Sequence, residues 1–289
     1  MDKHSFFIAL GILCLLPVSL FSRSRVVNDT IFSKKLNADR AYSVYLPPSF
    51  GEVQGKKYPV LYLFHGMSQT NQDWVWRGHV QEVADRLIYS QEAREMIIVM
   101  PDAGGDIYKE IWNGFFNMPG WLYEDFFFEE FLPYVENKYP IIGDKENRAV
   151  AGLSMGGGGA TGYGLWHADK FASVYAMSAL MSIPEEGAAR FDNPDSKLAI
   201  LTRTVIERSC IKRVTDADAG TIQALKSVRW FVDCGDDDFL LDRNIEFFQA
   251  MRKAGIPCQF RVRDGGHDWE YWHSALYRCL PFVSGTFSK

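Results

Sequence analysis

Short, almost wholly apolar runs recur along this chain and alternate with stretches of helical character. Such runs are typical of strands buried on both faces of a sheet. Two segments with alternating apolar and polar residues, 31–36 and 41–46, predict strands near the start. The buried strands are expected at Val60–Phe64, Met96–Met100, Ala149–Leu153, Ser173–Met177, Trp230–Cys234 and Gln259–Val262, and the helices at 79–90, 123–138, 156–167, 243–254 and 269–280. This alternation predicts an α/β fold with a mainly parallel central sheet and helices on both faces.

The interval from Ile183 to Lys226 interrupts this rhythm, because it is polar, helix-prone and longer than a simple crossover requires. An insertion at this point would lie over the carboxyl ends of the strands, where ligands bind to sheets of this type. We therefore expect a partial cap. A surface excursion without functional interest is an equally open alternative, since such loops vary freely.

The first 24 residues have the character of a targeting segment. Lys3 and His4 precede the apolar run Phe6–Phe21, and Ser22 and Ser24 follow it. A basic start, an apolar stretch and a small-residue exit predict a secretory signal peptide over residues 1–24. A membrane anchor is the weaker alternative, because the run is shorter than the roughly 20 residues that span a bilayer. We expect residues 25–289 to form one exported domain, periplasmic or extracellular, with no stable membrane span.

Composition and charge narrow the possible partners. The net charge is −5, and the chain contains no block of like charges. This composition disfavours nucleic acid as a partner, because such binding needs a basic surface. Cysteines in an exported protein can form disulfides, but their spacing here matches no metal site and we assign no bridge. The four cysteines beyond the predicted signal are Cys210, Cys234, Cys258 and Cys279. We expect neither a metal nor an organic cofactor.

The segment Gly152-Leu153-Ser154-Met155-Gly156 follows an apolar strand and precedes a glycine-rich helix start. Strand, sharp turn and helix form the setting of a nucleophile elbow. A serine in this strained turn needs glycine two residues before and two after, where a side chain would clash with strand and helix. We expect Ser154 to be a nucleophile and the amide of Met155 to donate to an oxyanion.

The turn after the strand Val60–Phe64 reads His65-Gly66-Met67. In folds of this kind that turn delivers a second oxyanion amide, and glycine allows the close backbone approach. We assign that amide to Met67. A histidine in this place is expected to be a hydrogen-bonded structural residue rather than a base.

An acid and a base should follow late strands, in the chain order Ser, Asp, His. Trp230–Cys234 leads into Gly235-Asp236-Asp237-Asp238, and Gln259–Val262 leads towards Gly265-Gly266-His267. We expect His267 to accept the Ser154 proton and an aspartate to hold its imidazole. We choose Asp238, because two residues beyond Gly235 are needed before a side chain can reach back to His267. Asp237 remains the alternative, since three consecutive aspartates blur the register.

These motifs resemble the esterase D and feruloyl esterase group of the α/β-hydrolase superfamily, which includes carbohydrate esterase family 1, with mycolyltransferases as more distant relatives. The matching stretches are Tyr58–Gly66, Trp121–Val135, Ala151–Gly157, Asp233–Leu240 and Arg263–Trp272. In that group the acid is typically the third residue after the glycine, which is Asp238 here. The resemblance implies an acyl-enzyme mechanism, no metal, and esters that are often acyl decorations of plant polysaccharide.

Export of the protein would favour feruloyl or acetyl-xylan esters as substrates over S-formylglutathione, a thioester that is made inside cells. Three tryptophans, Trp112, Trp121 and Trp269, lie in aromatic-rich segments and are candidates to bind a sugar or a phenolic acyl group. A place in the core is at least as good an explanation for each ring. An acyltransferase of the mycolyltransferase type and an S-formylglutathione hydrolase-like thioesterase remain alternatives. A carbohydrate-binding module without activity is disfavoured, because such a module would normally lack a triad member and none is missing here.

Overall fold

The computed structural model of the protein describes residues 23–288. Within them, eight strands form one sheet in the order β1-β2-β4-β3-β7-β8-β9-β10. β2 runs antiparallel to both of its neighbours, β1 and β4, and every pairing from β4 to β10 is parallel. The strands are β1 (Arg25–Ser33), β2 (Ala38–Leu46), β3 (Val60–Phe64), β4 (Ile97–Pro101), β7 (Arg148–Leu153), β8 (Ser173–Met177), β9 (Arg229–Gly235) and β10 (Cys258–Arg263). This sheet confirms the predicted fold class.

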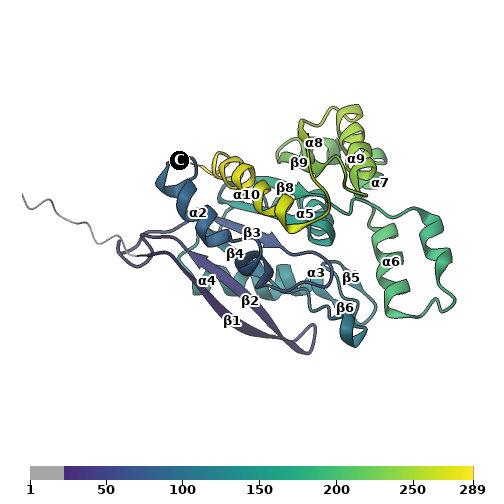
Figure 1. Ribbon diagram of the computed structural model, residues 1–289, viewed down its shortest axis with the longest axis horizontal. Coiled ribbons are helices and arrows are strands. Elements are labelled where there is room, and N and C mark those ends of the chain that lie inside the picture. Colours follow the sequence, from purple (N-terminus) through teal and green to yellow (C-terminus); the bar gives the residue numbers. More distant parts are fainter. Residues whose placement is uncertain (1–22, 289) are drawn as a thin grey trace, which may run out of the picture.

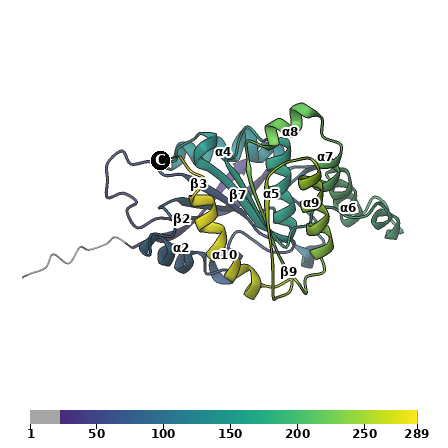
Figure 2. The same cartoon turned by 90° about the horizontal axis from the view of Figure 1, so that it is seen from above.

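Helices cover both faces of the sheet (Figures 1 and 2). One face carries α2 (Val80–Tyr89) and α10 (Trp269–Ser284). The other carries α4 (Leu132–Lys138), α5 (Ser154–Trp166) and α9 (Leu241–Lys253). Each layer encloses its own buried apolar cluster, so the central strands are covered on both sides, as their continuous apolar runs predicted.

The start of the sheet differs from the prediction. The first strand covers Arg25–Ser33 instead of residues 31–36, and a turn over residues 34–37 leads into β2. β1 is one of the two edge strands, and about half of its positions are exposed, so polar residues occupy many of them. The apolar alternation typical of a half-buried strand is therefore weak in this segment. For this reason the predicted bounds of the first strand were wrong.

The predicted helix over residues 123–138 is present but contains a widened turn. It consists of α3 (Tyr123–Phe126), a π-helical segment η2 (Phe127–Phe131) and α4. Several elements were too short for periodicity to reveal. They are α1 (Asp73–Trp76), η1 (Ile107–Lys109), η3 (Lys145–Asn147) and the hairpin of β5 (Asn117–Met118) with β6 (Trp121–Leu122).

The interval between β8 and β9 is helical, as predicted. It contains η4 (Glu185–Arg190), α6 (Lys197–Glu207), α7 (Cys210–Thr215) and α8 (Ala219–Leu225). Helix α6 lies at the end of the molecule remote from β1 and β2 (Figure 1). Arg208, which follows α6, donates from one nitrogen to both carboxylate oxygens of Glu124, at 2.6 and 2.7 Å. This ion pair ties the insertion to the helix that starts at Tyr123.

Two further expectations concern the N-terminal segment and the cysteines. The predicted signal peptide lies almost wholly outside the described residues. Between residues 23 and 288, no helix is both long and apolar enough to cross a membrane. Cys210, Cys234, Cys258 and Cys279 all have free thiols.

Candidate active site

The turn between β7 and α5 places Ser154 at the carboxyl edge of the sheet with a φ angle of 52°. That left-handed conformation is costly for serine and is kept only where the surroundings impose it. The surroundings are two glycines. A Cβ on Gly152 would lie 2.4 Å from the carbonyl oxygen of Gly156, and one on Gly156 would lie 2.2 Å from that of His65. Both glycines are therefore required by close packing, as the elbow motif predicts.

His267 lies in the loop between β10 and α10 and faces Ser154. Its Nε2 is 2.9 Å from the Ser154 Oγ, and its Nδ1 is 2.9 Å from Oδ2 of Asp238. The structure thus brings together three side chains that are distant in sequence, in the order of a Ser-His-Asp triad. Of the three consecutive aspartates, Asp238 is the one that reaches the imidazole.

Burial separates Asp238 from its two neighbours. Asp238 is 4% exposed, whereas Asp236 and Asp237 are exposed. Burial by itself raises the pKa of the Asp238 carboxyl, but hydrogen bonds from His267 and from the amide of Leu240 outweigh it. The net result is a pKa below the ordinary value, so the carboxylate stays ionised at neutral pH and can orient the imidazole.

The two expected oxyanion donors lie on adjoining turns. Met155 is the second residue of α5, so its amide is among those that have no acceptor within the helix. Met67 follows Gly66, whose Cβ position lies 2.7 Å from the Leu153 side chain, directly before Ser154. The turn that carries Met67 therefore packs against the elbow.

His65 has a structural role, as predicted. Its Nε2 accepts a hydrogen bond from the amide of Ala103 at 3.0 Å, so Nδ1 carries the proton and donates to the carbonyl of Gly66 at 2.7 Å. Burial lowers the pKa of this histidine and favours the neutral ring. The side chain thereby ties the turn after β3 to the loop after β4.

The three candidate tryptophans occupy different surroundings, and all are half-buried. Trp269 packs edge-on against Trp74 and Trp272. Trp121 stacks on Tyr123 with the guanidinium of Arg40 over its ring. Trp272 in turn contacts the His267 ring, so Trp269 lies one ring away from the triad. Substrate binding by Trp112, Trp121 and Trp269 stays a prediction.

Two aromatic rings that were not among the named substrate-binding candidates contact the histidine. Phe239 lies 4.5 Å from the His267 ring, measured between centroids, and is 76% exposed. Trp272 meets the same ring edge-on at 4.9 Å and is buried. The available signal for Phe239 was its position immediately after the acid, where an apolar residue on a loop is unusual.

The insertion also reaches the site. A cavity of about 10 Å³, room for about one water molecule, lies between α5 and α6. Its lining includes Met155, next to the serine, and Leu201 of α6. This contact supports the interpretation of the insertion as a partial cap.

One group of acidic residues could hold a cation. Carboxylate oxygens of Asp236, Asp237 and Asp264 lie within 4.8 Å of one another, and all three residues are exposed. Exposed carboxylates often gather without an ion, and this cluster carries no metal assignment.

Together, the sheet order, the strained Ser154 and the Asp238–His267–Ser154 chain define an α/β-hydrolase of the serine type. The profile of the Esterase family matches residues 33–283. The chain belongs to this family and is a carboxylic ester hydrolase.

Similar proteins agree with this class. A solved ferulic acid esterase is 67% identical, with a TM-score of 0.89, and the match covers 92% of this chain and 100% of that one. An endo-1,4-beta-xylanase/feruloyl esterase of Xylanibacter ruminicola is 31% identical over 90% of this chain, which corresponds to 31% of that longer protein. An acetyl esterase of Caldicellulosiruptor saccharolyticus is 24% identical over 81% of this chain and 86% of its own length.

Proposed function

We propose that the protein is an exported serine esterase that removes feruloyl groups from plant polysaccharide such as xylan. The observation that carries the mechanism is the continuous hydrogen-bonded chain from Asp238 through His267 to Ser154. The observation that supports the acyl group is the 67% identity to a ferulic acid esterase along the whole of that chain.

In the first half of the reaction, His267 removes the proton from the Ser154 hydroxyl as its oxygen attacks the ester carbonyl. The amides of Met155 and Met67 donate to the oxyanion of the tetrahedral intermediate. His267 then gives the proton to the departing sugar hydroxyl, which leaves the acyl group bound to Ser154. Asp238 keeps the imidazole in the tautomer that accepts at Nε2 and stabilises its positive form.

In the second half, water takes the place of the sugar. His267 accepts a proton from the water as its oxygen attacks the acyl-enzyme, and the collapsing intermediate releases a free carboxylic acid. The proton on His267 returns to Ser154, so the site is restored. Apart from the ester and one water molecule, the cycle uses only these side chains and amides.

An aromatic acyl group fits the surroundings of the histidine. Phe239 offers a largely exposed ring beside His267, where a planar feruloyl group could stack during attack. Acetyl groups gain little from such a ring. We therefore favour feruloyl over acetyl esters.

Export rests on the predicted signal peptide and on its boundary. Arg25 is the first residue of β1 and pairs with Leu46, so a mature chain that begins there retains the whole sheet. N-terminal sequencing of the native protein should find a start close to Arg25. An intact Met1 in a cytosolic fraction would contradict export.

The substrate is tested with wild type and Ser154→Ala on methyl ferulate, acetylated xylan, S-formylglutathione and p-nitrophenyl acetate. We expect the highest kcat/KM on methyl ferulate, and loss of at least about 10³-fold of it in Ser154→Ala. Preference for acetylated xylan or S-formylglutathione would move the assignment to that ester. Faster transfer to an added sugar than to water would make the protein an acyltransferase.

A further inference from the structure

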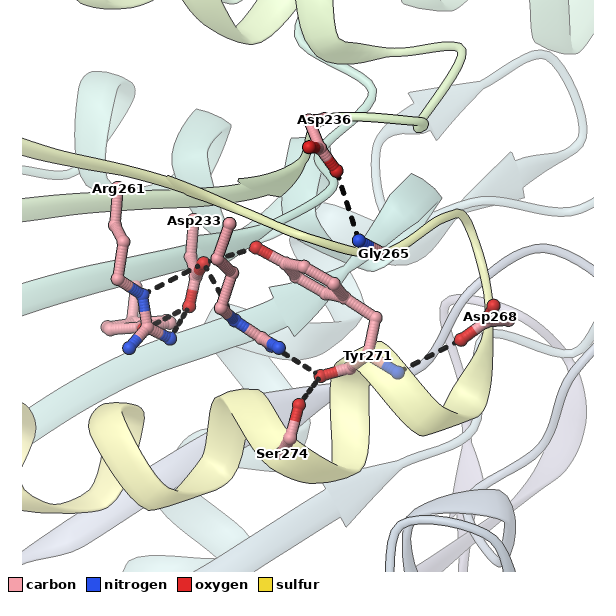
Figure 3. Close-up of polar contacts among 9 residues, drawn as sticks. Asp233, Asp236, Arg261, Gly265, Asp268, Tyr271 and Ser274 are labelled. Atoms are coloured by element: carbon pink, nitrogen blue, oxygen red, sulfur yellow. Dashed lines mark hydrogen bonds and ion pairs between the residues drawn. The ribbon is translucent and has the colours of Figure 1, made fainter.

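A fully buried carboxylate, Asp233 on β9, lies beneath the two loops that carry the acid and the base. Its Oδ2 accepts a hydrogen bond from the Tyr175 hydroxyl at 2.6 Å, and its Oδ1 accepts one from the Tyr271 hydroxyl at 2.5 Å. Arg261 donates to it from Nε at 3.2 Å and also from a terminal nitrogen, and Arg263 approaches Oδ1 to 3.8 Å. Figure 3 shows Tyr271 reaching from the start of α10 to this carboxylate.

The triad acid Asp238 and the triad base His267 both lie close to this cluster along the chain. Asp233 is followed two residues later by Gly235, where the loop to Asp238 begins. Tyr271 lies in the first turn of α10, and Asp268 caps that helix directly after His267 by accepting from the Tyr271 amide at 2.9 Å. The Asp233–Tyr271 hydrogen bond therefore joins the strand that delivers the acid to the helix that follows the base.

The two loops also touch each other through backbone contacts. The amide of Asp236 donates to the carbonyl of Arg263 at 3.0 Å, and that of Asp237 donates to Gly265 at 3.1 Å. The Gly265 amide returns a bond to the Asp236 side chain at 3.1 Å, as Figure 3 shows. The loop that leads from Gly235 to Asp238 (the acid loop) and the loop from Arg263 to His267 (the base loop) are thus paired like the ends of two short strands.

The ring of Tyr271 supports the base loop from below. A Cβ on Gly265 would lie 2.6 Å from this ring, so the loop rests directly on it. The guanidinium of Arg263 lies 3.5 Å from the ring centroid and donates to the Tyr271 carbonyl at 2.7 Å. Because the ring contacts both Gly265 and Arg263, we expect a shift of the ring to move the loop that carries His267.

We propose that Asp233 is a positioning residue for the triad, which acts through Tyr271 to hold His267 in register with Asp238. Burying a charge with two arginines is a costly way to fill space, and apolar side chains of the same volume often serve stability at least as well. What the buried Asp233 adds is a fixed geometry, because several charge-assisted hydrogen bonds to one carboxylate hold their donors in defined positions. The inference rests on the triad assigned in the proposed function.

The chain offers a matched pair of variants. Tyr271→Phe and Tyr175→Phe each remove one buried hydroxyl that donates to the same carboxylate, but only Tyr271 contacts the base loop. Tyr175 instead stacks on Phe231 and packs against Phe282. We expect similar decreases in melting temperature for both. With p-nitrophenyl acetate, kcat should fall about 10- to 100-fold in Tyr271→Phe alone, with KM within about twofold of wild type.

This result separates positioning from stability, since a purely structural role would affect both variants alike. Equal kcat values in the two variants, once scaled to the folded fraction, would overturn the inference. A crystal structure of Tyr271→Phe supplies a second readout, in which His267 Nδ1 and Asp238 should move out of hydrogen-bonding distance. An unchanged distance of 2.9 Å between them would also overturn it. Ser154→Ala on the same substrate tests the triad itself, so failure of the triad is recognised separately.

Discussion

Gly235 and Gly265 meet backbone to backbone at the base of the two catalytic loops. A Cβ on Gly235 would lie 1.9 Å from the Gly265 carbonyl oxygen and 2.6 Å from its carbonyl carbon. The contact joins the end of β9, which leads to Asp238, to the segment that leads to His267. The distance between acid and base therefore depends on the absence of a single methyl group.

The first prediction concerns this contact. Gly235→Ala should force the loops apart, destabilise the protein by about 1–3 kcal/mol through overpacking, and lower kcat about 10²-fold. The matched control is Gly220→Ala in α8, where the nearest atom to the new Cβ lies 3.6 Å away. Turnover of p-nitrophenyl acetate and the melting temperature measure both effects. Wild-type turnover in Gly235→Ala would show that the loops adjust without loss.

The second prediction identifies the triad acid. Asp238→Asn should keep the fold and lower kcat about 10⁴-fold, because the imidazole loses the carboxylate that orients it. Asp237→Asn is the control, since this side chain is exposed while its amide holds the contact to Gly265. If kcat falls strongly in Asp237→Asn but stays near the wild-type value in Asp238→Asn, the triad acid is Asp237.

The third prediction concerns substrate choice at Phe239. Phe239→Ala should raise KM for methyl ferulate about 2- to 10-fold, the value of one aromatic stacking contact, and leave p-nitrophenyl acetate turnover nearly unchanged. The ring is mostly exposed, so the melting temperature should not move. Tyr89 is an even more exposed aromatic residue at the end of α2, and Tyr89→Ala should leave both KM values unchanged. An unaltered KM for methyl ferulate in Phe239→Ala would exclude the ring from acyl binding.

The fourth prediction follows from the thiols. Burial raises the pKa of Cys210, Cys234 and Cys258 to about 12, and that of Cys279 well above its ordinary value. The thiolate is the reactive form, so at pH 8 all four groups are almost entirely protonated and inert. Native protein should resist iodoacetamide at pH 8, and all four should react in denaturant, as mass spectrometry would show. Rapid labelling of the native protein would mean that burial does not protect them.

The positions of Ser154, Asp238 and His267 could be anticipated because each depends on local sequence. The elbow needs glycines at fixed spacing, and the acid and base follow buried strands that apolar runs reveal. Strand order then brings the three together without further information. The same reasoning found β3 and β8 to the residue.

The cluster around Asp233 could not be anticipated in this way. Its members come from β8, β9, β10 and α10, and no spacing in the sequence indicates that Tyr175 and Tyr271 point to one carboxylate. The contact of Phe239 with His267 likewise depends on the path of a loop. The start of β1 was misplaced because an edge strand lacks the apolar pattern of a buried one.

Arg261 and Arg263 have a second consequence through their place on β10, the last strand of the sheet. Within residues 23–288 this strand pairs only with β9, which leaves its outer row of backbone groups available to another polypeptide. Charged side chains turned inward at such an edge disfavour the addition of a further strand and so protect against edge-to-edge aggregation. We therefore expect the two arginines that contact Asp233 also to disfavour edge-to-edge association between copies of the protein, so that their replacement lowers solubility.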